Sequence, residues 1–107
     1  MAIPNKVRVR LANDPFMKFC IKAGSGECRG AVQWHHAWEY AGRQIQEWWA
    51  IVPLCHYHHK PGVLDNDYAQ FIGLRRATYE ELKKYHRIDW QQLRIYLLKK
   101  YAKTNKI

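Results

Sequence analysis

All three cysteines and five of the six histidines of this 107-residue chain lie between residues 20 and 59. Within that stretch, residues 28–59 begin with Cys28, place His35 beside His36, and end with Cys55, His58 and His59. Thiolate and imidazole are side chains that bind borderline-soft metal ions such as zinc. An odd number of cysteines suits a disulfide framework poorly, so we expect thiolates held by a metal in a reducing compartment.

The spacing of the last three ligands predicts two metal sites rather than one. Pro53 fits the entrance of a short helix that carries these ligands and that Pro61-Gly62 ends after one or two turns. On such a helix Cys55 and His58 lie on one face, whereas His59 is rotated by about 100° from His58. Cys55 and His59 are also compatible on spacing alone. The pattern therefore predicts two sites more firmly than it says which histidine serves which.

The simplest closed tetrahedral zinc site uses Cys20, Cys28, Cys55 and His58, a common structural set with no open position for water. Such a site would connect the N-terminal loop with the helix and contribute folding energy directly. His35, His36 and His59 then remain for chemistry. Two alternatives stay open: His35 and His36 could be histidines without a role, and Cys20 could be a buried core residue beside Phe16 and Phe19.

The remaining patterns predict a single α+β domain. Residues 6–11 (KVRVRL) alternate basic with apolar side chains, which is typical of a strand. Residues 32–35 and 48–52 are expected to form the two strands of a hairpin. Their polar connector has its expected turn at Gly42-Arg43.

The second half of the chain is expected to be helical. Asp65 or Asn66 is the predicted cap of a helix that runs to about Gly73. Residues 78–81 (TYEE) form a capping-box signature for a helix to about residue 86. Asp89 is the predicted cap of a last helix, whose stripe at helical spacing is typical of core packing. The stripe consists of Trp90, Leu93, Leu97 and Tyr101.

The charge of the chain predicts a polyanionic partner. Its 18 basic and 9 acidic residues give a net charge of +9, and nucleic acid explains such an excess better than solubility alone. No run of about eighteen apolar residues is present, so no membrane partner is expected. The N-terminus, MAIPNKVRVR, lacks the apolar core of a signal peptide, so we expect a cytoplasmic protein.

The pattern C-x7-C-x6-HH, an aromatic-rich hairpin and then IVPLC-x2-HH resembles the HNH endonucleases. The likeness is closest to small phage-type members that carry a structural zinc, and it covers about residues 20–64. It implies a zinc-stapled ββα-metal core over these residues. The expected N-terminal strand and a C-terminal helical extension over about residues 65–103 lie outside the resemblance. It also implies a bacterial or phage-infected cell as the setting.

The resemblance implies a role for each ligand. His36 would be the general base that activates water, and His35 and His59 would bind a catalytic divalent ion. That ion is typically magnesium or manganese, although zinc or nickel can occupy such a site. Cys55 and His58 would complete the structural zinc site. A neutral imidazole can accept a proton from water near neutral pH, and a divalent ion supplies the Lewis acid.

The expected function is a metal-dependent DNA endonuclease or nickase, with one metal and a histidine general base. The DNA could be branched or single-stranded, and Arg43, Lys60 and Arg29 are candidate contacts to phosphate. The alternative is a zinc-containing nucleic-acid-binding module without catalysis, such as a recombination accessory protein. A third possibility is a module for protein interaction. The pattern does not decide between a monomer and a homodimer.

The chain departs from the family pattern in two places. The family's middle Asn, which supports the base, corresponds to Ala50, so Gln44, Gln46 or Glu47 would have to supply a replacement side chain. Family members often carry a further His after the helix, where this chain has residues 64–67 (LDND). Asp65 or Asp67 could assist the metal there, although helix capping is the expected role.

Overall fold

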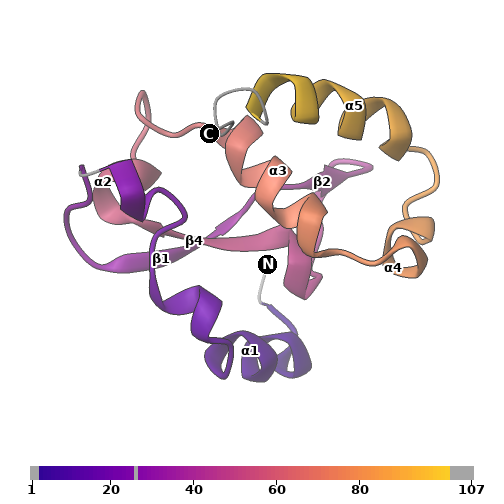
Figure 1. The fold of residues 1–107 in the computed structure, drawn as a ribbon. Helices are drawn as coiled ribbons and strands as arrows, with labels where there is room; N and C mark the ends of the chain where they lie inside the picture. Colours follow the sequence, from indigo (N-terminus) through magenta and orange to yellow (C-terminus); the bar gives the residue numbers. More distant parts are fainter. Residues whose placement is uncertain (1–2, 26, 102–107) are drawn as a thin grey trace.

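The computed structural model describes residues 3–25 and 27–101, and it has an α+β fold (Figure 1). Its helices are α1 (Asn5–Ala12), α2 (His56–His59), α3 (Asn66–Arg76), α4 (Tyr79–Lys83) and α5 (Trp90–Tyr101). Its strands are β1 (Val32–His36), β2 (Glu39–Tyr40), β3 (Arg43–Gln44) and β4 (Ile51–Cys55). Short 3-10 turns cover Pro15–Lys18, Ala23–Ser25 and Trp48–Ala50. No helix in the described ranges is long and apolar enough to cross a membrane.

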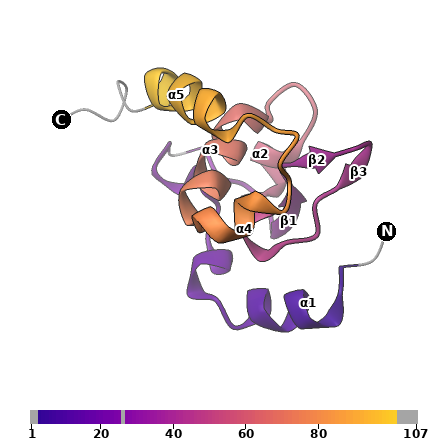
Figure 2. The same cartoon turned by 90° about the vertical axis from the view of Figure 1, so that its right-hand side faces the viewer.

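The centre of the molecule is the antiparallel pair of β1 and β4, which leads directly into α2. In this pair Val32 lies opposite Cys55 and His36 lies opposite Ile51. Helices α1 and α5 lie at opposite ends of the molecule, as Figure 1 and Figure 2 both show. Every residue of β4 is buried, so this strand lies at the centre of the packing.

The segment between β1 and β4 contains a second, smaller hairpin. Glu39 pairs with Gln44 and Tyr40 with Arg43, which leaves Ala41 and Gly42 as the turn. Both turn residues have positive φ (53° and 80°), as a tight two-residue hairpin turn requires. The turn therefore lies one residue earlier than the expected Gly42-Arg43. The expected strand 48–52 is also displaced, because Trp48–Ala50 forms a 3-10 turn and the strand begins at Ile51.

Pro53 lies inside β4 and not at the entrance of a helix, so this prediction was wrong. It faces Trp34 in the β1–β4 register. Its carbonyl oxygen accepts a hydrogen bond from the backbone N–H of Ile21 at 3.0 Å. The N and O atoms of one strand residue point to the same side, so the missing N–H of Pro53 faces away from β1 and costs no hydrogen bond between the strands.

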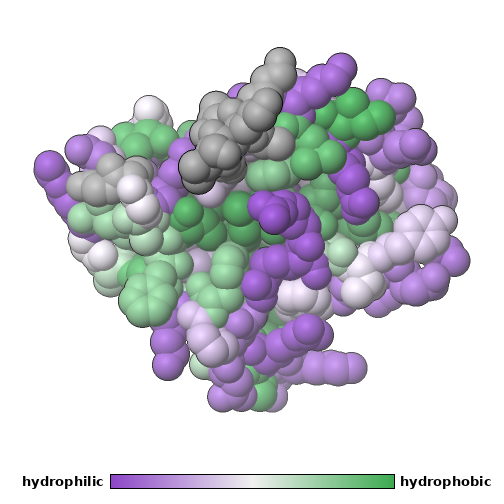
Figure 3. Space-filling model, in the orientation of Figure 1, coloured by the Kyte–Doolittle hydropathy of each residue, from purple (hydrophilic) through white to green (hydrophobic). Residues whose placement is uncertain are grey.

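Residues 6–11 were expected to form a strand, but they belong to the helix α1. The basic–apolar alternation hides a second pattern, because Val7 and Leu11 are four apart and share one helical face. Leu11 is fully buried against Met17 and Ile51, and Val7 packs against the same cluster. Val9, which a strand would have buried with them, is half exposed. Figure 3 shows mostly hydrophilic side chains over this end of the molecule.

Helix α5 packs on α3, and its stripe belongs to the core, as predicted. Leu97 and Tyr101 are buried in the main core, and Trp90 and Leu93 pack against it. Asp65 caps α3 through the backbone N–H of Tyr68. The predicted capping box of α4 is present, although the helix ends at Lys83, before the expected residue 86. Residues 102 and 103 of the expected extension lie outside the described ranges.

Helix α3 approaches the 3-10 turn Trp48–Ala50 so closely that Gly73 is required. A Cβ at this position would lie 2.5 Å from the backbone oxygen of Trp49, and this backbone atom cannot rotate away. We expect Gly73→Ala to destabilise the protein by about 1–3 kcal/mol through overpacking. A loss of stability would be informative, because replacing Gly by Ala within a helix ordinarily stabilises a protein by up to about 1 kcal/mol.

Chemical denaturation at a fixed metal concentration measures this difference in the free energy of unfolding. Gly24→Ala is the matched control, since nothing lies within 4 Å of the position that a Cβ would take at residue 24. A Gly73→Ala protein as stable as the wild type would show that α3 and Trp49 can move apart at little cost.

Candidate metal centre and histidine cleft

Cys20, Cys28, Cys55 and His58 come together as one group, as predicted. Their ligand atoms all lie within 4.8 Å of one another. The Nδ1 atom of His58 is 3.5, 3.6 and 3.3 Å from the sulfurs of Cys20, Cys28 and Cys55. A sulfur and a nitrogen that share one tetrahedral zinc are separated by about 3.6 Å, given the usual bond lengths. This group could therefore hold a metal ion, and its donors are consistent with a structural zinc.

Two backbone contacts bring the distant cysteines to α2. Cys20 is placed by the hydrogen bond from Ile21 to Pro53, which aligns its segment with β4. Cys28 is placed by the bond from the N–H of Tyr57 to the carbonyl of Arg29 at 3.1 Å. These bonds explain how a seven-residue gap between two cysteines still delivers both sulfurs to one site.

Gly30 permits the second of these approaches. Its φ is +82°, and a Cβ there would lie 2.7 Å from the Cβ of His56. A larger residue at position 30 would therefore push the Cys28 segment away from α2. Cys55 and His58 need no such help, because the sulfur of Cys55 caps α2 by accepting from the backbone N–H of His58 at 3.4 Å.

The surroundings of Cys55 and Cys28 shift the pKa values of their thiols in opposite directions. Burial tends to raise the pKa of Cys55, but the backbone N–H groups of His58 and Arg29 donate to its sulfur and lower the pKa to about 6. Desolvation of the sulfur and the adjacent sulfurs of Cys20 and Cys55 raise the pKa of Cys28 to about 11. Cys28 is an exposed residue, so we attribute its shift mainly to the neighbouring sulfurs. A divalent cation would let all three ionise.

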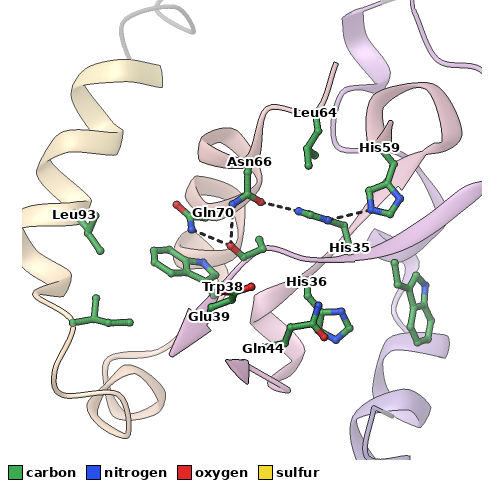
Figure 4. Close-up of a pocket in the computed structure, with 13 residues that line it drawn as sticks. His35, His36, Trp38, Glu39, Gln44, His59, Leu64, Asn66, Gln70 and Leu93 are labelled. Carbon is green, nitrogen blue, oxygen red and sulfur yellow. Dashed lines mark hydrogen bonds between the residues drawn. The ribbon is translucent and has the colours of Figure 1, made fainter. Parts of the chain in front are cut away.

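His35, His36 and His59 form a second group, which lines a cleft (Figure 4). His35 comes from β1 and His59 from the end of α2, and His35 Nδ1 is 3.2 Å from His59 Nε2. Two nitrogens bound to one ion at about 2.1 Å with this separation would subtend roughly 100° at the ion, which suits tetrahedral or octahedral coordination. The structure thus separates His58 from His59 in the way that their rotation on the helix predicts.

The protonation state of His35 follows from its contact with Asn66. The Nδ2 atom of Asn66 donates to the carbonyl oxygen of Ala37 at 3.3 Å, and a carbonyl can only accept. The other amide atom, Oδ1, therefore faces His35 Nε2 at 2.7 Å and accepts a hydrogen bond from its N–H. His35 Nδ1 is left as a lone pair directed at His59. Burial also lowers the pKa of His35, which keeps the ring neutral.

Gln33 holds His59 in the corresponding way. Its Oε1 atom is 2.6 Å from His59 Nδ1, so that nitrogen is the donor and Nε2 faces His35 with a lone pair. Two facing lone pairs repel unless a proton or a metal ion lies between them. Outer carboxamides that fix the ring tautomers are typical of metal-binding histidines.

His36 has a different partner, Gln46. Its Nε2 atom is 3.0 Å from Gln46 Oε1, which leaves Nδ1 as the nitrogen that can accept a proton. Ala50, where the family would place Asn, is fully buried, and its carbonyl accepts from the N–H of Ala37. Glu47 accepts from the Tyr85 hydroxyl instead. Of the candidate replacements, Gln46 hydrogen-bonds to His36, and Gln44 lines the same cleft.

The two aspartates after α2 are engaged elsewhere. Asp65 caps α3 and accepts from the hydroxyl of Tyr101 at 2.8 Å. Asp67 binds Lys100 at 2.9 Å, and this contact lowers the pKa of its carboxyl. Asp65 therefore has the capping role that was expected, whereas Asp67 pairs with Lys100. The residue between them, Asn66, is the one that reaches the histidines.

The three candidate phosphate contacts are all exposed, in two places. Arg29 and Lys60 each lie 5.6 Å from the ring of Tyr57 on α2, next to the zinc-type group. Arg43 lies on β3, in the smaller hairpin. The sequence analysis did not place Asn66 and Gln70 at the site, because an isolated carboxamide cannot be distinguished by sequence from any polar surface residue.

The histidines open into a cleft of about 900 Å³ between β1, β2 and the C-terminal helices. It is lined by Trp34, His35, His36, Ala37, Trp38, Glu39, Gln44, His59, Leu64, Asn66, Gln70, Ile88 and Leu93. Trp34 comes from β1, and Gln70 donates to the Ala37 carbonyl at 2.9 Å. The histidines lie toward one end of the cleft, and Leu93 of α5 lines the other end.

We expect the purified protein to retain about one zinc ion per chain after dialysis. His58→Ala should lose this ion and unfold at lower temperature, whereas His56→Ala, an exposed histidine of the same helix, should keep it. Mass spectrometry of the dialysed proteins measures the content. Zinc should also be released as the pH falls, because protons compete for the thiolates. Full zinc retention in His58→Ala would refute the assignment of the four ligands.

The chain was compared with protein-family models, with curated proteins and with solved structures, and none of the three comparisons found a match. The likeness to HNH endonucleases therefore depends on the sequence motif alone. What the site can do has to be judged from its own geometry, which consists of a closed four-ligand group and an open group of three histidines beside a cleft.

Proposed function

We propose that this protein is a metal-dependent DNA endonuclease or nickase of the HNH type. The observation that carries the proposal is the pair of facing nitrogens of His35 and His59, 3.2 Å apart and each backed by a carboxamide. This pair lies next to His36, which has a support of its own. Three histidines so arranged match a one-metal hydrolytic site with a separate base.

In this proposal β1, β4 and α2 are the ββα-metal core, and the four-ligand group is its structural zinc site. The zinc would connect the segments of Cys20 and Cys28 with α2, so that the helix is held while His59 faces the cleft. The second divalent ion, magnesium or manganese, would be bound by His35 and His59. With two protein ligands it keeps open positions, and when bound it supplies Lewis-acid stabilisation of the departing oxygen.

The protein's own residues would perform the proton transfer. His36 Nδ1 accepts a proton from water while Gln46 holds the Nε2 proton, so the ring keeps the orientation and the tautomer of a base. The water oxygen forms a bond to phosphorus and the bond to the 3′ oxygen breaks. The departing oxygen takes a proton from solvent, which leaves a 3′-hydroxyl and a 5′-phosphate.

The net charge of +9 supports DNA as the substrate. Exposed cations beside Tyr57, Arg29 and Lys60, and Arg43 on the β2–β3 hairpin, are the proposed phosphate contacts. The alternative is a module that binds nucleic acid without cutting it. Both proposals predict binding that weakens as salt rises, because cations on the protein release counterions from DNA.

Replacing the proposed base distinguishes these functions. His36→Ala should lower plasmid nicking in manganese or magnesium at least about 100-fold, the usual contribution of a general base. Zinc content and DNA affinity should stay unchanged. His86→Ala, an exposed histidine outside the cleft, is the matched control and should nick normally. Gln46→Ala should fall between the two, because the ring stays but loses its support.

Wild-type protein that binds DNA in a salt-dependent way but nicks none of it with any divalent metal would favour the non-catalytic alternative. Nicking that survives in His36→Ala would show that another group is the base.

Asn66 provides a second test, directed at the proposed metal. Asn66→Ala should weaken manganese binding about 10- to 100-fold, as losses of outer partners of metal-bound histidines do. Asn66→Asp should lose less, because a carboxylate still accepts from His35 Nε2. Titration with manganese, followed by calorimetry, measures the affinity without relying on activity. Equal affinity in all three proteins would exclude the tautomer argument for His35.

A further inference from the structure

The cleft extends well beyond the histidines. Figure 4 shows Leu93 of α5 on the far side of Trp38 and Gln70 from His59. The volume of about 900 Å³ is in the range of sites that enclose a small molecule or part of a larger one. The histidines occupy one end only, so the other end has no role in the chemistry proposed above.

The far end is not built for phosphate. None of the described residues that line the cleft is Lys or Arg, although the chain has 18 of them. The charged side chain that does line this part is the exposed carboxylate of Glu39. Phosphates are bound by cations and backbone N–H groups, and a carboxylate repels them. We therefore expect the DNA backbone to contact the histidines and not the far end of the cleft.

The same end suits an uncharged, flat and partly polar group. Ile88 and Leu93 form an apolar wall, and both are partly exposed. Because the Nε2 atom of Gln70 is used by Ala37, its amide oxygen is the atom left to accept a hydrogen bond. Apolar walls with a few acceptors at fixed positions are how proteins hold a nucleobase by its face and its edge.

We infer that the far end of the cleft holds a nucleobase of the substrate, so that the nucleotide beside the cleaved phosphate is unpaired. The inference rests on the proposed function. A base in a duplex is stacked and paired, and it can enter a pocket beside the backbone only after it has left the stack. Single strands, mismatched bubbles and flaps present such a base at low cost, whereas intact duplex does not.

The test uses one fluorescent DNA strand in three forms: single-stranded, fully paired, and paired except for a bubble at the cleavage site. Wild type with manganese should cut the single strand and the bubble at least about fivefold faster than the duplex, since contacts to one base contribute roughly 5- to 150-fold in affinity. Fluorescence anisotropy of His36→Ala should give the same order of affinities without cleavage.

Truncating the apolar wall should remove this preference. Leu93→Ala should weaken binding of the single strand about fivefold or more and leave duplex binding unchanged. Leu98→Ala, on the same helix but outside the cleft, is the matched control and should change neither. Ile88→Ala repeats the test from the loop before α5, should Leu93→Ala unfold.

Duplex cut and bound as well as the single strand, or equal losses for both substrates in Leu93→Ala, would overturn the inference and leave the proposed function intact. Failure to cut any of the three forms would instead end the proposed function, and the anisotropy measurements would still decide whether a base is bound.

Discussion

The junction between β4 and α2 is the constraint on which the rest of the structure depends. Cys55 ends the strand, caps the helix and supplies a sulfur to the four-ligand group. The next turn then places His58 and His59 about 100° apart, so one faces the sulfurs and the other faces His35. A four-residue helix could not hold this geometry alone. The cysteine segments from both sides hold it instead.

Carboxamide side chains hold the histidine rings in position. Asn66, Gln33 and Gln46 each contact one imidazole, and each contact selects which ring nitrogen carries the proton. A neutral amide can do this without adding charge. A carboxylate in these positions would hold the ring more strongly but would also favour its protonated form. Neutral supports thus suit rings that must keep a lone pair available.

The four residues that could hold a metal ion were predictable from sequence, because cysteine and histidine are rare and their spacing on a helix is constrained. The capping of α3, α4 and α5 was equally accessible, since Asp65, Thr78 and Asp89 act on neighbours three residues away. Helix capping depends on residues that are close together in the sequence, so it can be predicted from the sequence alone.

Features that depend on distant partners could not be predicted. Whether residues 6–11 form a strand or a helix depends on burial of Leu11 against Ile51, forty residues away. The position of Pro53 depends on which side of β4 receives Ile21. Gln46 was one of three candidates, and only the path of the chain between the two hairpin strands decides that its amide meets His36.

Helix α5 influences the orientation of His35 through the start of α3. Asp65 is bound to Tyr101 and Asp67 to Lys100, so the last turn of α5 holds the residues on either side of Asn66. The amide that orients His35 therefore lies between two anchors that belong to another helix. How firmly α5 packs on α3 therefore determines how precisely the ring of His35 on β1 is oriented.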